Sequence, residues 1–171
     1  ARGANDIAHR AKQTTGLIFR YAIATGRADR DPRSDLKGAL RPRRKKHHAA
    51  ITDPQAVGHL LVAIDAFQGT PVVKAALQLS PLLFQRPGEI RHMEWAELNW
   101  EESRWEIPAE KMKMGQPHIV PLSAQSLAIL RELQRLTGRG RYVFPSARGA
   151  KRPLSDNGVR VALRTMGYDK E

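Results

Sequence analysis

The segment from Val72 to Phe84 constrains the fold most, because it is apolar on nearly every side of a helix. A helix of this kind has no polar face for water, so other elements must cover it all round. The dipeptide Thr70-Pro71 is typical of a helix start, with a capping hydroxyl and a proline suited to the first turn. The chain therefore predicts one buried helix with the rest of a domain packed around it.

Three further helices are predicted around this one, each with apolar residues on one face only. The first follows Thr52-Asp53-Pro54-Gln55, which offers an N-cap and a glutamine at capping-box spacing. The second begins at Ser123 and stops at Gly138, and the third begins at Ser155-Asp156. The inward residues are Val57, Leu60, Leu61, Ile64 and Phe67; Leu127, Leu130, Leu133 and Leu136; and Val159, Ala162, Leu163 and Met166.

The part between the central helix and Ser123 predicts a small sheet. Apolar and polar residues alternate over 98–107, and 118–122 supplies a third strand after a turn at 113–117. Residues 138–153 are predicted to be a glycine- and arginine-rich loop. The fold class is therefore mainly α with a small three-stranded antiparallel β-sheet (α+β).

Charge points to a polyanionic partner. The net charge is +12, and 13 Lys and Arg against 4 Asp and Glu in residues 1–50 supply +9 of it. Basic side chains that replace phosphate counterions give salt-dependent affinity, although a merely solubilising surface is the plainer alternative. The absence of cysteine excludes disulfides and thiolate metal sites. No apolar run suits a membrane span or signal peptide, which fits a cytoplasmic protein.

The N-terminal part predicts a helix over 4–26, with Ile7, Ala11, Ile18 and Ala22 on one face. It is either the last helix of another domain or packed on the main domain. Residues 29–48 hold Asp-Pro and the run Arg41-Pro42-Arg43-Arg44-Lys45-Lys46-His47-His48, which predicts an unpacked linker. The run could follow a phosphate backbone or be a solvated charge run. Because the chain begins at Ala1 rather than at a methionine, we expect a piece of a longer protein.

Two basic residues are candidates for holding phosphate. Arg86 stands where the buried apolar helix stops, so its guanidinium needs an anion or carbonyl partners, and Glu89 three residues on is an ordinary partner. Lys113 stands on the turn before the third strand, with Lys111 as a less favoured candidate for the same task. Either lysine could equally be a solvated turn residue.

These segments together resemble the tyrosine recombinase (phage integrase) family, most closely the integrases of P4-like prophages and genomic islands. Arg86-Pro87-Gly88-Glu89-Ile90 resembles the family's Arg-x-Gly-Glu-Leu box. Trp95-Ala96-Glu97-Leu98-Asn99 resembles its Trp-x-Asp-Ile-Asp strand entry. The stretch 113–122 resembles its Lys-x-Gly-Lys-x-x-x-Val-Pro-Leu hairpin, with Met112 where the family usually has threonine. Three boxes in order make the resemblance specific.

The resemblance implies a site-specific recombinase that cuts and rejoins double-stranded DNA at attachment sites through a 3′-phosphotyrosine. Arg86 would hold the scissile phosphate, Lys113 would give a proton to the leaving 5′-oxygen, and Glu89 would orient Arg86. Phosphodiester energy is conserved, so no metal or other cofactor is expected. Implied partners are further copies on DNA and accessory DNA-bending proteins, in the bacterial cytoplasm. DNA contacts are expected from Arg41, Arg43, Arg44, Lys45 and Lys46.

The resemblance also implies the domain organisation and its gaps. Residues 1–28 would be the C-terminal helix of the core-binding domain, 29–50 a basic interdomain linker, and 51–171 the N-terminal part of the catalytic domain. The family's His-x-x-Arg box and late tyrosine have no match, and we assign the nucleophile to none of Tyr21, Tyr142 and Tyr168. The 171 residues alone are therefore predicted to be inactive. The alternative from another class is a non-enzymatic basic or architectural DNA-binding module. An RNA-binding basic domain is a weaker alternative, because this sequence has no aromatic stacking motif of the usual kind.

Overall fold

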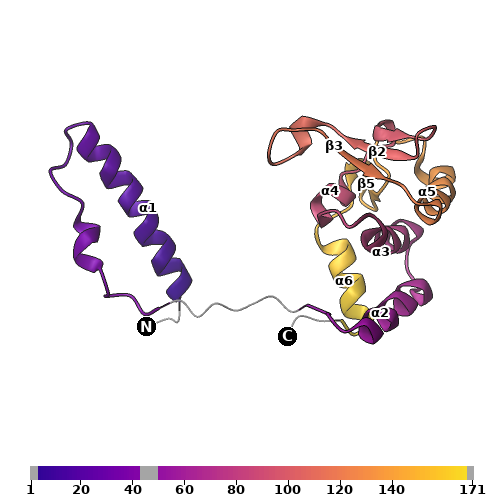
Figure 1. Cartoon of the computed structure of the whole chain (residues 1–171), viewed down its shortest axis with the longest axis horizontal. Helices are drawn as coiled ribbons and strands as arrows, with labels where there is room; N and C mark the ends of the chain where they lie inside the picture. Colours follow the sequence, from indigo (N-terminus) through magenta and orange to yellow (C-terminus); the bar gives the residue numbers. More distant parts are fainter. Residues whose placement is uncertain (1–3, 43–49, 169–171) are drawn as a thin grey trace. The chain divides into compact units, whose positions relative to one another are not determined.

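A computed structural model describes residues 4–42 and 50–168 of the chain (Figure 1). The chain divides into two compact units, residues 1–48 and residues 49–171. No helix among the described residues is both long enough and apolar enough to cross a membrane.

The first unit is a helix with a short 3₁₀ turn packed against it. Helix α1 (Asn5–Ala24) is followed by η1 (Pro32–Leu36), which begins where the Asp31 carboxylate accepts a hydrogen bond from the Arg33 backbone N–H. The Lys12 ammonium donates to the Leu36 carbonyl oxygen at 2.5 Å, and His9 Nε2 lies 2.9 Å from the Arg41 carbonyl oxygen. The prediction that 29–48 is unpacked is therefore wrong for residues 31–41. The sequence does not predict this packing, because the side chains responsible lie on α1, distant in sequence, and bind backbone carbonyl oxygens of residues 36 and 41.

Gly16 allows the close approach of η1 to α1. It is the buried residue of α1, and a Cβ at this position would lie 2.1 Å from a guanidinium nitrogen of Arg33. The predicted apolar face lies on the other side of the helix, and its residues Ile7, Ala11 and Ile18 are exposed.

The second unit is built around α3 (Pro71–Leu83), as the apolar segment predicts. Helix α3 contacts α2 (Pro54–Ala66), α4 (Pro87–Arg91), α5 (Ala124–Thr137) and α6 (Asn157–Thr165), and lies between them in Figure 1. The side chains of Asp53, Thr70 and Ser123 cap α2, α3 and α5 by accepting backbone N–H bonds. The residues of α3 that face these neighbours are almost completely buried: Ala75, Ala76, Leu77, Leu79 and Leu83.

The predicted three-stranded antiparallel sheet is present. Its strands β1 (Leu98–Asn99), β2 (Arg104–Ile107) and β3 (His118–Pro121) lie in the order β1-β2-β3, so that Trp105 is opposite both Leu98 and Val120. Short 3₁₀ turns precede β1 and follow β2, at η2 (Trp95–Glu97) and η3 (Ala109–Lys111). The inner face of the sheet contributes Trp105, Ile107 and Val120 to the core. The mainly α fold with a small sheet is confirmed.

The prediction of a loop over 138–153 is wrong for residues 145–153. Strands β4 (Pro145–Ser146) and β5 (Gly149–Pro153) form a second antiparallel hairpin. It is fixed to the core by Phe144, which is fully buried and accepts the Leu154 N–H bond at 2.7 Å. Because β5 is exposed along most of its length and carries basic side chains, it lacks the apolar alternation that indicates a strand.

The end of α3 also differs from the prediction. Phe84, expected to close a buried apolar helix, is 91% exposed, and Leu82 is 41% exposed. Phe84 takes the left-handed conformation, with φ of 53°, directly after the last residue of the helix. This reversal turns the chain toward α4 and leaves the ring outside the core. An aromatic residue is strained at positive φ because its Cβ crowds the backbone.

Replacing Phe84 by glycine is therefore expected to stabilise the second unit by about 1 kcal/mol. Glycine adopts the left-handed conformation freely, and the exposed ring has little buried contact to lose. Urea unfolding of Phe84→Gly measures the change. Phe84→Ala is the control, since it removes the ring but keeps the Cβ, and should change stability by less than about 0.5 kcal/mol. Destabilisation by Phe84→Gly would show that the ring is packed.

Candidate active site

Arg86 is fixed at the start of α4 by Glu89. The Glu89 carboxylate accepts the Arg86 backbone N–H at 3.1 Å through Oε2 and the Arg86 Nη1–H at 2.6 Å through Oε1. Pro87 occupies the first turn of α4, and buried Ile90 anchors this short helix to the core. The position of Arg86 is thus set by α4 rather than by the end of α3.

The sequence places Arg86 at the end of a buried helix, but its side chain is 69% exposed, whereas that of Glu89 is 11% exposed. The reversal at Phe84 carries the chain out of the core before Arg86 is reached. The ordinary partner, Glu89, is present. A guanidinium has five N–H donors in a planar fork, so an exposed one held by a single carboxylate oxygen at Nη1 still presents donors to an anion.

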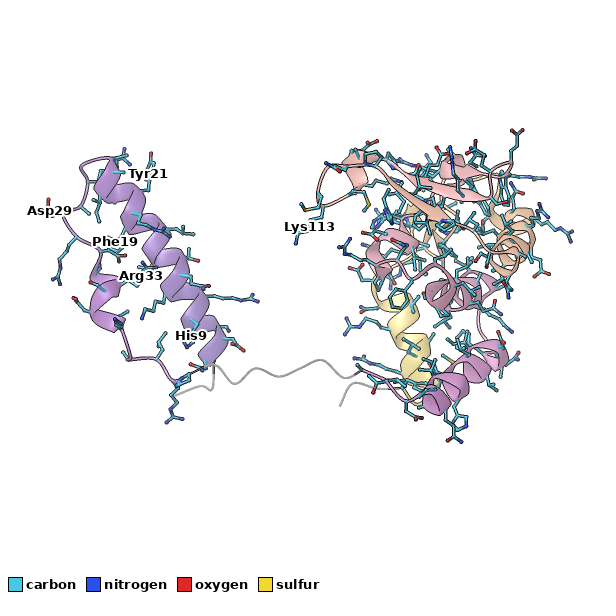
Figure 2. All side chains as sticks on the ribbon, in the orientation of Figure 1. His9, Phe19, Tyr21, Asp29, Arg33 and Lys113 are labelled. Atoms are coloured by element: carbon cyan, nitrogen blue, oxygen red, sulfur yellow. The ribbon has the colours of Figure 1, made fainter. Side chains whose placement is uncertain are left out.

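Lys113 lies on the loop between η3 and β3. Its side chain is exposed and extends from the loop that joins β2 to β3 (Figure 2). Gly115 has a φ of 65°, which a glycine adopts without strain, and its N–H donates to the Met112 carbonyl oxygen at 2.9 Å. The lysine therefore sits on a short, solvent-exposed turn, as the sequence predicts.

One cleft of about 710 Å³ brings Arg86 and Lys113 together. Helix α4 supplies one wall with Arg86, Glu89 and His92, and the loop before β3 supplies another with Lys113. The floor includes the inward strand residues Trp105 and Ile107. Two exposed cations from different parts of the sequence thus line the same space.

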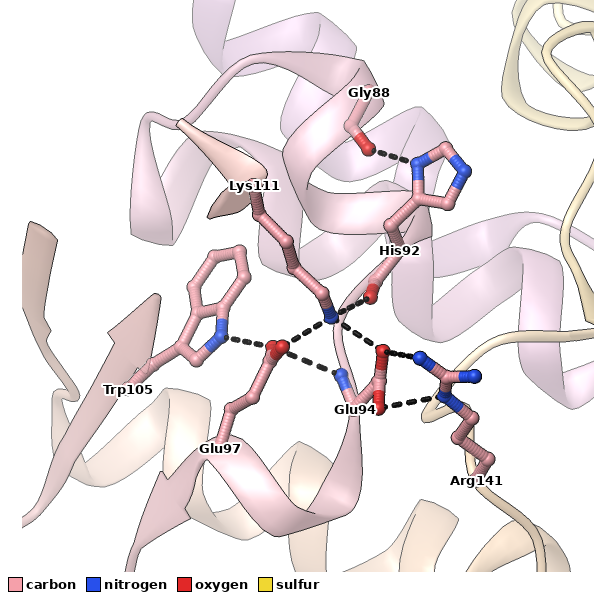
Figure 3. A network of polar contacts seen from close by, with 7 residues as sticks. All are labelled: Gly88, His92, Glu94, Glu97, Trp105, Lys111 and Arg141. Carbon is pink, nitrogen blue, oxygen red and sulfur yellow. Dashed lines mark hydrogen bonds and ion pairs between the residues drawn. The ribbon is translucent and has the colours of Figure 1, made fainter. Parts of the chain in front are cut away.

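A charge cluster lies at the same cleft and was not predicted as a unit (Figure 3). The Lys111 ammonium donates to Glu94 Oε1 at 2.5 Å, to Glu97 Oε1, and to the His92 carbonyl oxygen at 3.3 Å. Arg141 grips Glu94 with two bonds, from Nε at 2.7 Å and from Nη2 at 2.9 Å. Two carboxylates and two cations make the cluster formally neutral.

The neighbours of the cluster tie it to the sheet. Trp105 Nε1 donates to Glu97 Oε2 at 2.9 Å, and the same oxygen accepts the Glu94 backbone N–H at 3.1 Å. The Arg141 guanidinium lies 5.3 Å from the centre of the Tyr142 ring. Glu97 falls within a quoted motif of the sequence and Lys111 is the less favoured candidate for the task of Lys113, but Glu94 and Arg141 carry no local signal. Only the fold brings the four together.

The cluster shifts the pKa values of its members. Hydrogen bonds from Arg141 and Lys111 outweigh burial and lower the pKa of Glu94 from 4.5 to about 2. Burial opposes the charged form of Lys111, but its hydrogen bonds to Glu94 and Glu97 outweigh burial and raise the pKa of Lys111. Lys111 therefore holds its proton more tightly than an ordinary lysine, which suits a structural ion pair better than proton donation.

The shift at Glu94 predicts a pH dependence of stability. Because the folded pKa of Glu94 is depressed, its stabilising effect is complete above pH 4.5 and is lost as the pH falls toward 2. We expect the free energy of unfolding to fall more steeply between these pH values in the parent chain than in Glu94→Gln, which has no proton to bind. Urea unfolding at several pH values measures both slopes. Equal slopes would contradict the depressed pKa.

The remaining predicted residues are placed as follows. Arg41 is described, and its carbonyl oxygen accepts from Asn5 at 3.1 Å. Arg43, Arg44, Lys45 and Lys46 lie outside the described residues. In residues 4–42 and 50–168, no group of three or more His, Asp or Glu is arranged to hold a metal ion.

Comparison with known proteins identifies the family. Residues 51–171 match the phage integrase family, and residues 1–39 match the phage integrase central domain. The chain is 35% identical to the integrase of enterobacteria phage P4, over 99% of this chain and 41% of the phage protein. It is also 35% identical to the putative protein IntB of Escherichia coli K12, over 98% of this chain and 45% of that protein.

Solved structures share the fold. A lambda integrase dimer bound to a COC′ core site matches with a TM-score of 0.70 at 21% identity, over 97% of this chain and 46% of that one. A lambda integrase tetramer bound to a Holliday junction matches with a TM-score of 0.69, also at 21% identity, over 97% and 48%. The chain belongs to the phage integrase family. It spans less than half the length of these relatives.

Proposed function

We propose that this chain supplies the first part of the active site of a site-specific DNA recombinase, a prophage or genomic-island integrase that cuts and rejoins DNA through a 3′-phosphotyrosine. The observation that carries the proposal is the single cleft lined by the exposed Arg86 and the exposed Lys113. A planar guanidinium and a mobile ammonium suit the two tasks of phosphate binding and proton delivery.

In this proposal Arg86 donates hydrogen bonds to the non-bridging oxygens of the scissile phosphate. Its charge stabilises the extra negative charge that develops as the phosphorus gains a fifth oxygen. Glu89 orients Arg86, because it holds both the backbone and the side chain of that residue. Lys113 gives a proton to the departing 5′-oxygen. Lys111 is less suited to this task because its ammonium is already bonded to Glu94, Glu97 and the His92 carbonyl oxygen.

Double-stranded DNA at attachment sites is the proposed substrate. The net charge of +12 supports a polyanionic partner, and the basic run Arg41–Lys46 is proposed to contact the DNA backbone. The lambda integrase structures are a dimer and a tetramer on DNA, which supports assembly of several copies on DNA here too. Accessory DNA-bending proteins, a cytoplasmic location in a bacterium, and the division into domains at residues 28 and 50 remain predictions. The proposed chemistry needs neither metal nor nucleotide, since the phosphotyrosine bond keeps the phosphodiester energy.

A nucleophile is not assigned to any tyrosine of this chain. Tyr142 lines the cleft, but the Arg141 guanidinium lies over its ring, which suits a packing role. We therefore propose that these 171 residues bind DNA without cutting it, and that cutting needs a later tyrosine from a longer chain.

A nicked suicide substrate, whose cut product diffuses away and traps the covalent complex, tests this proposal. An integrase that contains these residues and continues to a late tyrosine should form a covalent adduct with DNA. The 171 residues alone should shift DNA in a binding assay and give no adduct. An adduct from the 171 residues would contradict their inactivity. Binding without any adduct from the longer protein would favour the non-enzymatic DNA-binding module instead.

A further inference from the structure

The chain is held firmly just before Lys113 and is exposed from Lys113 onward. Lys111 ends η3 and is bonded to Glu94 and Glu97, and Met112 packs half-buried against the core. Lys113 is the first exposed residue of the loop, and Met114 after it is 84% exposed. The anchor and the proposed proton donor are therefore two residues apart on one segment.

The anchor joins parts of the chain that are distant in sequence. Glu94 and Glu97 lie on the segment that follows α4, the helix that begins after Arg86. Arg141 binds Glu94 from the other side, and its carbonyl oxygen accepts the Trp95 N–H at 3.1 Å. Lys111 thus fastens the loop that carries Lys113 to the part of the fold that leads directly from Arg86.

The bonding of Lys111 fits anchoring and leaves no spare donor for another task. An ammonium has three N–H donors, and Lys111 has three acceptors in Glu94, Glu97 and the His92 carbonyl oxygen. The carboxylates are well shielded, with Glu94 13% and Glu97 8% exposed, so water screens these ion pairs little. A partly buried pair of this kind specifies one arrangement of the two segments that it joins.

We infer that Lys111 is a positioning residue, which holds the root of the loop so that Lys113 reaches the same phosphate as Arg86. The task of Lys113 at the phosphate rests on the proposed function, whereas the anchoring of the loop rests on the hydrogen bonds of Lys111. Lys111 fixes the position from which Lys113 extends to the phosphate, and the ammonium of Lys111 itself does not touch DNA.

A double-mutant cycle on DNA affinity tests the inference, with a plain DNA duplex at fixed salt as the probe. In the parent chain, Lys113→Ala is expected to weaken binding about tenfold, the usual size of a charged hydrogen bond. In a Lys111→Gln background the same change should cost less than twofold, because the released loop no longer holds Lys113 at the phosphate. Arg86→Ala should cost the same in both backgrounds, since Glu89 positions Arg86 independently.

Two variants guard against a merely structural explanation. Lys111→Arg keeps the charge and the donors and should restore the cost of Lys113→Ala. Lys74→Gln, which removes a lysine charge from α3 outside the cleft, should leave the cycle unchanged. A second readout needs no DNA: amide hydrogen exchange of Met112 and Gly115 should be at least tenfold faster in Lys111→Gln.

The outcomes separate this inference from the proposed function. Equal costs of Lys113→Ala in both backgrounds would overturn the inference, as would unchanged exchange at Met112 and Gly115. A loss of the Arg86→Ala effect in Lys111→Gln would also overturn it, because the whole cleft would then be disturbed. If neither Arg86→Ala nor Lys113→Ala affects binding in the parent chain while exchange quickens, the anchor stands and the proposed function fails.

Discussion

In an integrase that carries these residues, Arg86→Ala is expected to slow strand cleavage about 1000-fold while weakening DNA binding only a few-fold. In the proposed site, the exposed guanidinium contacts a phosphate that many other basic groups also help to hold, so its loss should change ground-state binding little. Charge develops on the phosphate oxygens in the transition state, and a positioned donor there contributes about 4 kcal/mol. Single-turnover formation of the covalent adduct at saturating protein measures the loss.

Arg148→Ala is the matched control, since it removes an exposed arginine in the turn of the β4–β5 hairpin rather than at the cleft. It should leave the cleavage rate within about threefold of the parent. Arg86→Lys should recover only part of the rate, because an ammonium cannot place two parallel N–H bonds on a phosphate. Equal losses of binding and of cleavage in Arg86→Ala would mean that the arginine is an ordinary phosphate contact.

Lys113→Ala is expected to slow cleavage on ordinary DNA by about 1000-fold at saturating protein, where its roughly tenfold weaker binding no longer limits the rate. A positioned general acid contributes roughly 100- to 10,000-fold, because an alkoxide leaves poorly without a proton. The measurement is the same single-turnover rate, with Lys151→Ala on β5 as the control for loss of a lysine charge. A Lys113→Ala rate within fivefold of the parent would exclude the lysine as the proton donor.

The elements that packing dictates could be predicted from the sequence. The helix 71–83 is apolar on nearly all sides and lies at the centre of the second unit, with the amphipathic helices around it. The alternation of apolar and polar residues around Trp105 predicts the sheet correctly, because alternate residues of a strand face the core. Arg86 and Lys113 could be named because each stands at a change of structure, the first between two helices and the second on a turn.

The parts that depend on contacts across the chain could not be predicted. Phe84 looked like the end of a buried helix, but the left-handed reversal there is decided by how α4 must turn back onto the core. The η1 turn is held by carbonyl contacts from α1, and the β4–β5 hairpin by main-chain pairing. Neither leaves an apolar pattern. The charge cluster at the cleft forms only where the folded chain brings its four residues together. Arg141 is 47 residues from Glu94, so the sequence does not indicate that the two side chains pair.

We propose that one cleft holds two groups with different tasks, Arg86 stabilising charge and Lys113 donating a proton. The most direct measurement uses DNA in which the leaving 5′-oxygen at the cleavage site is replaced by sulfur. A thiolate leaves without a proton, since thiols have pKa values of about 8.5. This substrate should therefore restore cleavage by Lys113→Ala to within about tenfold of the parent rate and leave Arg86→Ala slow. This division of tasks would be contradicted if Lys113→Ala cut the sulfur substrate as slowly as ordinary DNA. It would also be contradicted if the sulfur substrate restored cleavage by Arg86→Ala equally.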